Sequence, residues 1–276
     1  MEYYQFTFEA LKADEKDMLI ALLSHAGFSG FEEGEESLKA FVSEVDFDPE
    51  AFDTVTAAGF NSYIKTSIKE INWNEQWESG FEPVTIIDPA SQIPVVHIRA
   101  GFHPVNTSVK YDLEITPKMS FGTGHHDTTC LVIEQMIGLD FKDKTVIDYG
   151  TGTGVLAILA EKLGAATILA IDNDKWSIEN AEENVSRNDC NKVKLKQDDT
   201  IPAGSKADII LANINLNIIL ASLDAIQAAA RPGAVVLFSG IMVHDEPIIM
   251  LALTERGIGV QEHFSRNNWL IIRAKL

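Results

Sequence analysis

The sequence predicts an α/β fold in two parts, a small α+β unit followed by a larger domain with a parallel sheet. The first observation is a β-α-β-β-α-β order of apolar runs over residues 1–71. The second is a series of strand-like runs that alternate with helical ones from Lys144 onward, a pattern that requires a parallel sheet covered on both faces. The third is the length of 276 residues, which suits two domains better than one.

The small unit is expected to begin with a half-buried strand, because Tyr4, Phe6 and Phe8 alternate with polar residues. Asp14 is expected to cap a helix that Gly27 ends. Further strands are predicted over 28–33, 37–43 and 62–71, and a helix over 49–58. This order is that of a ferredoxin-like domain. Since the unit lacks a His, Cys and carboxylate cluster, we predict a binding or docking module.

A change of composition marks the expected linker, residues 72–83, where the paired tryptophans Trp73 and Trp77 precede Gly80 and Pro83. The larger domain is predicted over residues 84–276. Its expected strands are 84–87, 95–99, 111–116, 145–149, 167–171, 193–196, 207–212 and 234–239, with a helix over 127–137 and a closing hairpin from runs near 259–264 and 269–274.

Charge and cysteine content limit the class of protein. The chain has 22 Lys and Arg against 41 Asp and Glu, a formal net charge of −19, which disfavours direct nucleic-acid binding and favours a basic protein partner, although solubility alone would also explain it. Two cysteines are too few for a disulfide framework. No apolar run approaches the roughly 18 residues of a membrane span, and no secretion signal is evident, so we expect a cytoplasmic protein without membrane contact.

The segment "VIDYGTGTG" predicts a ligand site. An apolar strand runs into Gly150, Gly152 and Gly154, so the glycines form the turn between the strand and the next helix, where α/β sheets bind ligands. Backbone without Cβ atoms lets a ligand approach closely, and the helix start adds N–H donors. The dinucleotide fingerprint would need a glycine at position 155, where this chain has Val155.

Two carboxylates restrict the chemical class of the expected ligand. Asp148 lies inside the strand before the loop, where it would repel a pyrophosphate and accept from an ammonium group, directly or through water. Asp172 ends the next strand, where a carboxylate can accept both hydroxyls of a ribose. A ribose joined to a cationic amino-acid end describes S-adenosyl-L-methionine, which we predict as the cofactor.

The chain resembles Rossmann-like class I methyltransferases in this loop, and one family among them in particular. "ITPKMSFGTGHHDTT", residues 115–129, is similar to the D-P-x-x-A-F-G-T-G-x-H-x-T-T segment of the bacterial ribosomal protein L11 methyltransferases. The resemblance continues in "LANIN" from Leu211, "LFSGI" from Leu237, the Trp73 and Trp77 pair, and Trp269. It spans most of the chain, and the amino-terminal unit corresponds to that family's substrate-recognition domain.

This resemblance implies a function and a set of residues. The substrate would be ribosomal protein L11, and the acceptors its lysine ε-amines, with the α-amine as a further one. A flexible segment from Phe121 to Gly124 would pack over the cofactor, while the glycine loop holds it from below. The cofactor-contacting positions that match are Thr129, Gly150, Asp172 and Asn213.

Asn213 is the expected catalytic residue, because its side-chain carbonyl can orient an incoming amine; the alternative is a loop-capping asparagine. The chain departs from the family pattern at Thr116, Ser120 and Asp127, and Asn215 stands where an apolar residue is more usual. No metal site is predicted, because the adjacent residues 125–127 would not face one another on a helix.

Three other functions remain at this stage. A methyltransferase of the same fold could act on another protein or on a small molecule. A nicotinamide-dependent oxidoreductase is disfavoured by Val155 and Asp148. A non-catalytic adaptor would bind the cofactor without turnover.

Overall fold

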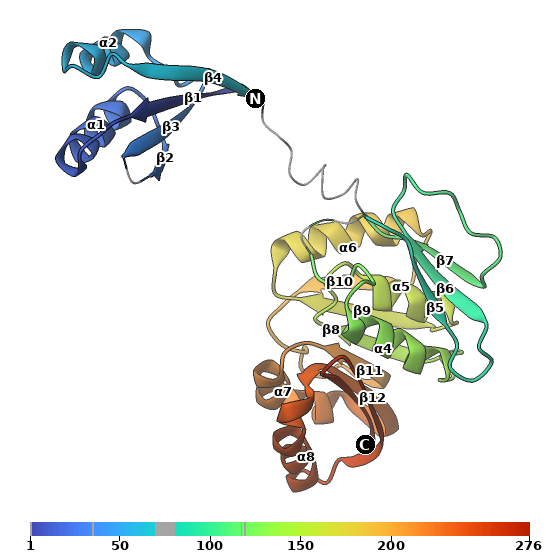
Figure 1. Cartoon of the computed structure of the whole chain (residues 1–276). Helices are drawn as coiled ribbons and strands as arrows, with labels where there is room; N and C mark the ends of the chain where they lie inside the picture. Colours follow the sequence, from blue (N-terminus) through green and yellow to red (C-terminus); the bar gives the residue numbers. More distant parts are fainter. Residues whose placement is uncertain (1, 35, 70–80, 117, 119) are drawn as a thin grey trace. The chain divides into compact units, whose positions relative to one another are not determined.

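The computed structural model describes residues 2–34, 36–69, 81–116, 118 and 120–276. The chain divides into two compact units, residues 1–77 and residues 78–276 (Figure 1). Most of the predicted linker, including Trp73 and Trp77, lies outside the described residues. None of the described helices combines the length and the apolar character that crossing a membrane would require.

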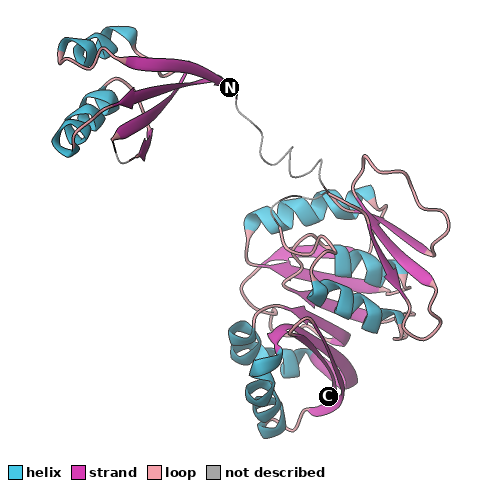
Figure 2. Ribbon diagram, in the orientation of Figure 1, coloured by secondary structure: helices cyan, strands magenta, loops and turns pink. Residues whose placement is uncertain are grey.

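The first unit has the predicted ferredoxin-like fold, with helices on one face of a four-stranded antiparallel sheet (Figure 2). Phe6 and Phe8 on β1 pack with Leu19, Leu23 and Phe52 from the helices in its core. The strand order is β2-β3-β1-β4. The elements are β1 (Glu2–Glu9), α1 (Ala13–His25), β2 (Gly30–Glu33), β3 (Ser37–Ser43), α2 (Pro49–Ala57) and β4 (Tyr63–Lys69).

The predicted cap of the first helix is wrong. Helix α1 begins at Ala13, so Asp14 lies inside its first turn, and Lys12 occupies the capping position. The carboxylate of Glu15, in the first turn of the helix, reaches back and accepts from the Lys12 N–H at 2.8 Å. This bond gives the backbone N–H of the capping residue a partner. Asp48 caps α2 in the ordinary way, accepting from two backbone N–H groups of its first turn.

The second unit contains a seven-stranded sheet of order β10-β9-β8-β11-β12-β14-β13. The first five strands are parallel, and β14 is antiparallel to both of its neighbours. The strands are β8 (Thr145–Tyr149), β9 (Thr167–Asp172), β10 (Val193–Gln197), β11 (Ala207–Asn213), β12 (Ala230–Met242), β13 (Gly259–Arg266) and β14 (Trp269–Lys275). The closing hairpin is confirmed, and Asn267 and Asn268 turn it with positive φ angles of 45° and 69°.

Helices cover both faces of this sheet (Figures 1 and 2). One face packs against α4 (Asp127–Ile137), α5 (Val155–Lys162) and α6 (Lys175–Arg187), and the other against α7 (Leu216–Ala229) and α8 (Glu246–Glu255). Neighbouring residues of β8 show the division, since Val146 belongs to the first core and Ile147 to the second. A smaller sheet of β5 (Val84–Ile87), β6 (Pro94–Arg99) and β7 (Tyr111–Glu114) adds to the first core.

Candidate cofactor-binding site

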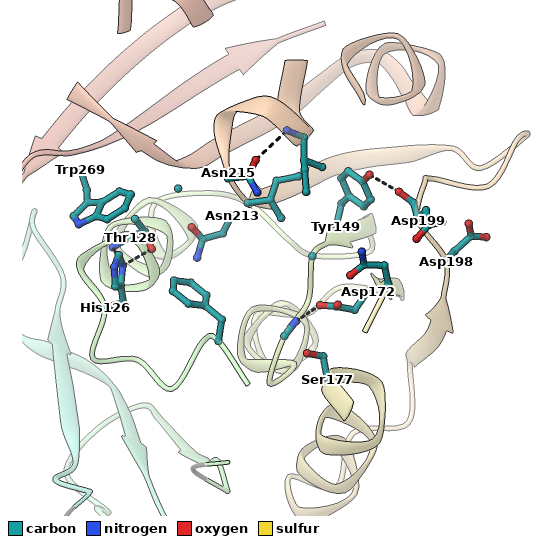
Figure 3. Close-up of a pocket in the computed structure, with 17 residues that line it drawn as sticks. His126, Thr128, Tyr149, Asp172, Ser177, Asp198, Asp199, Asn213, Asn215 and Trp269 are labelled. Atoms are coloured by element: carbon teal, nitrogen blue, oxygen red, sulfur yellow. Dashed lines mark hydrogen bonds between the residues drawn. The ribbon is translucent and has the colours of Figure 1, made fainter. Parts of the chain in front are cut away.

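The carboxyl ends of β10, β9, β8 and β11, together with β12, meet at a cavity of about 390 Å³ (Figure 3). This is the edge at which an open α/β sheet binds ligands. Seventeen residues line the cavity: Phe121, His126, Thr128, Tyr149, Gly150, Gly152, Asp172, Asn173, Ser177, Asp198, Asp199, Asn213, Ile214, Asn215, Ile218, Gly240 and Trp269. Five of the residues predicted to hold the cofactor are among them, namely Phe121, Gly150, Gly152, Asp172 and Asn213.

The glycine loop has the backbone that its sequence requires. Gly150, Gly152 and Gly154 have φ angles of 81°, 54° and 83°, in the left-handed region that favours glycine. A Cβ at Gly150 would collide with the side chain of Ile214, and one at Gly152 with the carbonyl oxygen of Phe121. Gly154 does not line the cavity; it is the residue before α5, in the N-cap position, and a Cβ there would lie 3.2 Å from Ala181.

Asp172 is fixed by backbone donors at the end of β9. One carboxylate oxygen accepts from the Gly152 N–H at 2.8 Å, and the other accepts from the Asp174 N–H at 3.0 Å. The bond from Gly152 connects the carboxyl end of β9 to the glycine loop. The carboxylate therefore faces the cavity in one orientation, with lone pairs still available to hydroxyl donors.

Asp148 is fully buried beneath the glycine loop and does not line the cavity. One of its oxygens accepts from the Thr151 hydroxyl at 2.6 Å, and the other, Oδ1, has no hydrogen-bond partner among the described residues. Burial raises the pKa of Asp148 to about 7; the Thr151 bond opposes the rise, and the charge of Asp172 adds to it. A cation held against the loop would stabilise the ionised form.

Asn213 ends β11, is 8% exposed, and lines the cavity. Its amide nitrogen donates to the Thr129 hydroxyl at 3.5 Å, so Thr129 contacts Asn213 without lining the cavity itself. Its carbonyl oxygen Oδ1 accepts no hydrogen bond from any described residue. A buried acceptor without a partner is costly, so this oxygen is available for a donor that enters the cavity.

An aromatic wall lies beside Asn213. The ring of His126 is 5.0 Å from that of Phe121 and 4.7 Å from that of Trp269, measured between centroids. Figure 3 shows Trp269, His126 and Asn213 toward one side of the cavity and Asp172 and Asp198 toward the other. The cavity therefore has an aromatic, largely apolar end next to the unpartnered oxygen of Asn213 and an acidic end at the carboxyl ends of β9 and β10.

Some of these residues escaped the sequence prediction. Asp198 and Asp199 directly follow β10. They could have been predicted from the sequence, because β10 ends at the same edge of the sheet as the strands before the glycine loop and Asp172. Tyr149, whose hydroxyl donates to the Asp199 carbonyl at 2.7 Å, carried no such signal. His126 precedes α4 and accepts from the Thr128 N–H, so the expectation of residues 125–127 together on one helix is wrong.

Three of the four departures from the family pattern, Thr116, Asp127 and Asn215, have local structural roles. The Thr116 hydroxyl donates to Glu183 at 3.2 Å, and Asp127 accepts from the Asn267 amide at 3.1 Å. Asn215 caps α7, with its side-chain oxygen accepting from the Ile218 N–H at 3.1 Å. The oxygen of Asn215 is therefore occupied, unlike that of Asn213.

Comparison with known proteins gives the family. Residues 14–276 match the family model of ribosomal protein L11 methyltransferase (PrmA). A protein of that name from Phocaeicola vulgatus is 36% identical, with 99% of each chain covered, and one from Chlorobaculum tepidum is 38% identical, with 89% of this chain and 86% of that protein covered.

A solved structure supports the same assignment. The crystal structure of a ribosomal protein L11 methylase from Lactobacillus delbrueckii subsp. bulgaricus is 29% identical and has a TM-score of 0.60, covering 69% of this chain and 97% of that one. The glycine loop has Val155 where the dinucleotide fingerprint requires a glycine, which disfavours a nicotinamide enzyme. The chain belongs to the ribosomal protein L11 methyltransferase family.

Proposed function

We propose that this chain methylates amino groups of ribosomal protein L11, with lysine ε-amines as the main acceptors and the α-amine as a further one. The methyl donor is S-adenosyl-L-methionine, which supplies a methyl group already activated by its sulfonium charge. The unpartnered Oδ1 of Asn213 supports an amine acceptor most directly, because it is a buried hydrogen-bond acceptor beside the apolar end of the cavity.

The chain's own task is to bind the amine in its neutral form, after the ammonium has lost its proton to solvent, to orient it and to exclude water. A lysine amine has a pKa of about 10.4 in water, and transfer to an apolar site favours its neutral form. Asn213 would hold an N–H of that neutral amine, which directs the nitrogen lone pair into the cavity. The rings of Phe121, His126 and Trp269 would keep water away from the reacting nitrogen.

The donor set also fits the cofactor. Gly150 and Gly152 leave space along the backbone, and Asp172 offers a fixed carboxylate to ribose hydroxyls. The unpartnered oxygen of Asp148 suits the cationic amino-acid end of the cofactor, directly or through water. Phe121 also lines the cavity. Thr129 and Gly154 do not line it, and would support the site indirectly, Thr129 through its contact with Asn213 and Gly154 through the turn into α5.

A pH dependence of cofactor binding follows from Asp148. Its pKa is about 7 without a neighbouring cation, and a bound ammonium group would lower that pKa, so binding would release a proton. Affinity should rise with pH up to the pKa of about 7 and level off above it, making the Kd of S-adenosylhomocysteine about tenfold higher at pH 6 than at pH 8. Isothermal titration calorimetry in two buffers of different ionisation enthalpy measures both quantities.

The matched variant is Asp148→Asn, which keeps the shape and removes the titration. It should bind more weakly at pH 8 and show a flat Kd between pH 6 and 8. A wild-type Kd that does not change over this range, with no proton release, would exclude contact between the ammonium group and Asp148.

The partner and setting are part of the same proposal. Acidic residues outnumber basic ones about three to one in residues 1–77, which contain no Arg, so this unit suits a basic protein better than a nucleic acid. We therefore assign substrate recognition to residues 1–71, with the linker over 72–83 and catalysis in 84–276. A ribosomal substrate favours action in the cytoplasm and away from a membrane, and the net charge of −19 disfavours direct nucleic-acid contact.

Mass spectrometry of L11 tests the substrate. L11 purified from cells that lack its modification should gain mass in methyl steps when incubated with the enzyme and S-adenosyl-L-methionine, and peptide fragmentation should place the groups on lysines or the α-amine. An unchanged L11 mass, with cofactor binding confirmed by calorimetry, would refute the substrate and leave the cofactor site standing. Methylation of a different protein in a cell extract would then support a same-fold enzyme with another substrate.

A further inference from the structure

We propose that Thr153 and Asn184 are positioning residues of the cofactor site, which hold the segment Ser120–His126, named here the strap, against the glycine loop. The strap brings Phe121 to the cavity. This inference rests on the proposed cofactor site and is independent of the acceptor substrate. It deepens that site by assigning the residues that keep its two glycine-containing segments together.

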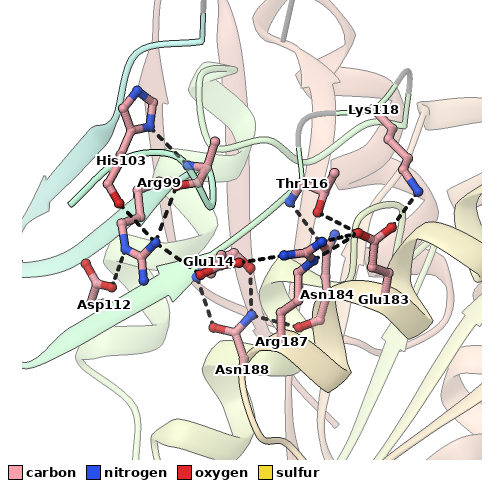
Figure 4. A network of polar contacts seen from close by, with 11 residues as sticks. Arg99, His103, Asp112, Glu114, Thr116, Lys118, Glu183, Asn184, Arg187 and Asn188 are labelled. Carbon is pink, nitrogen blue, oxygen red and sulfur yellow. Dashed lines mark hydrogen bonds and ion pairs between the residues drawn. The ribbon is translucent and has the colours of Figure 1, made fainter. Parts of the chain in front are cut away.

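Asn184 of α6 and Asn188, which caps the carboxyl end of that helix, bind the backbone at the end of β7 in place of a neighbouring strand (Figure 4). Asn188 accepts from the Glu114 N–H at 3.0 Å and donates to the Glu114 carbonyl at 2.7 Å, and Asn184 accepts from the Thr116 N–H at 2.8 Å. Alternate residues of an extended chain present backbone groups on the same side about 7 Å apart, close to the spacing of side chains four apart on a helix. The chain leading to the strap is therefore placed by α6.

Asn184 has a second contact that Asn188 lacks. Its amide nitrogen donates to the carbonyl of Thr153, in the glycine loop, at 2.8 Å, and the side chain is fully buried. One amide group thus joins the backbone before the strap to the backbone that surrounds the cofactor cavity. The side-chain nitrogen of Asn188, which donates to Glu114, donates its other bond to the carbonyl of Asn184 in the last turn of α6.

Thr153 completes the link. Its N–H donates to the Phe121 carbonyl at 2.9 Å, and its hydroxyl donates to the Gly122 carbonyl at 2.6 Å. Both Thr153 and Gly122 are buried, so water does not replace these bonds readily when they are lost. Every backbone polar group and the hydroxyl of Thr153 are therefore used to connect α6, the glycine loop and the strap.

This arrangement explains why two Gly-Thr-Gly segments occur in one chain. The threonine of the second segment binds the glycine-containing start of the first, and Gly152 lies against the Phe121 carbonyl. The position of Phe121 relative to the loop is consequently set by hydrogen bonds of Thr153 and Asn184, neither of which lines the cavity. Both residues act on the cofactor through the strap and the loop.

Paired variants of Thr153 test the hydroxyl. Thr153→Val keeps the shape and the backbone N–H but leaves the Gly122 carbonyl without a donor, whereas Thr153→Ser keeps the hydroxyl. We expect Thr153→Val to raise the Kd of S-adenosylhomocysteine about tenfold, with kcat at saturating cofactor changed less than about threefold, and Thr153→Ser to restore the Kd to within about twofold of wild type. Hydrogen exchange of residues 120–126 should accelerate in Thr153→Val alone.

Paired variants of Asn184 and Asn188 separate positioning from stability. Asn184→Asp and Asn188→Asp both keep an acceptor for β7 and lose a buried donor, but only the first loses a bond to the glycine loop. We expect Asn184→Asp to raise the Kd about tenfold and Asn188→Asp to leave it within about twofold, although both lower the free energy of unfolding. The assignment is overturned if the two variants bind equally, or if Thr153→Val and Thr153→Ser bind as wild type does. These titrations contain no L11, so failure of the substrate proposal does not affect them.

Discussion

Replacing Asn213 with alanine is expected to lower kcat for methylation of L11 about 100- to 1,000-fold, the range found when one preorganised polar group is removed from an active site. The reason is geometric. The unpartnered Oδ1 of Asn213 is the buried acceptor at the apolar end of the cavity, and without it a neutral amine has no fixed orientation toward the methyl group. Single-turnover rates with saturating cofactor, followed by mass spectrometry, measure the effect directly.

The matched control is Asn215→Ser, two residues further along the same loop. Asn215 also lines the cavity, but its oxygen is occupied by the Ile218 N–H, and serine preserves a helix cap. This variant should keep kcat within about threefold of wild type. If Asn213→Ala methylates L11 at a similar rate, Asn213 is only a loop-capping residue, and the acceptor must be oriented by another group.

Much of the fold of this chain can be predicted from its sequence because the local sequence signals agree with one another. Strand periods, helix caps and glycine stops place β3, β5, α4 and β8 at their observed bounds. Other elements differ from their predicted bounds, and two of these differences show physical causes. Strand β12 begins at Ala230, which pairs with Ala207 of β11, and continuous pairing with β11 and β14 resumes only at Val235. Pro232 and Gly233, which normally disfavour a strand, lie in the register shift between these two points. Helix α1 starts before Asp14 because the carboxylate of Glu15, within the helix, accepts from the N–H of the capping residue Lys12.

The cofactor side of the site is more predictable than the acceptor side. Gly150 and Gly152 follow β8 and Asp172 ends the adjacent strand β9, so the chain order alone brings them to one edge of the sheet. Trp269 reaches the same cavity from β14, far along the chain, through the antiparallel pairing of Met242 with Trp269. Such a contact depends on β14 pairing with β12 as well as with its hairpin partner β13, and local residue patterns do not specify that choice of partner.

The role of Thr153 illustrates the same limit. Its side chain lies between two glycines of a recognisable loop, so the motif marks it as part of a turn. Only the packing of the strap shows that its hydroxyl and N–H bind residues some thirty positions earlier. Motifs thus identify which backbone surrounds the ligand, whereas tertiary contacts decide what holds that backbone in place.

Gly152→Ala is expected to raise the Kd of S-adenosylhomocysteine at least about 100-fold, the second largest effect, because two penalties act on one position. Gly152 has a φ angle of 54°, which costs an L-residue roughly 1–2 kcal/mol, and a Cβ there would collide with the Phe121 carbonyl. Backbone on both sides of the collision must move. The displaced strap would also strain the Thr153 bonds and withdraw the Gly152 N–H from Asp172. Calorimetric titration measures the Kd, and urea unfolding measures the accompanying loss of stability.

Gly204→Ala isolates the conformational part of this effect. Gly204 has a φ angle of 83°, and a Cβ there would meet no atom within 4 Å, so the variant carries the left-handed strain without a collision. It should lose about 1 kcal/mol of stability and bind S-adenosylhomocysteine as wild type does. A Gly152→Ala variant that lost no more affinity than Gly204→Ala would mean that the strap leaves the glycine loop freely in solution. In that case neither Phe121 nor the Thr153 link could set the shape of the cofactor site.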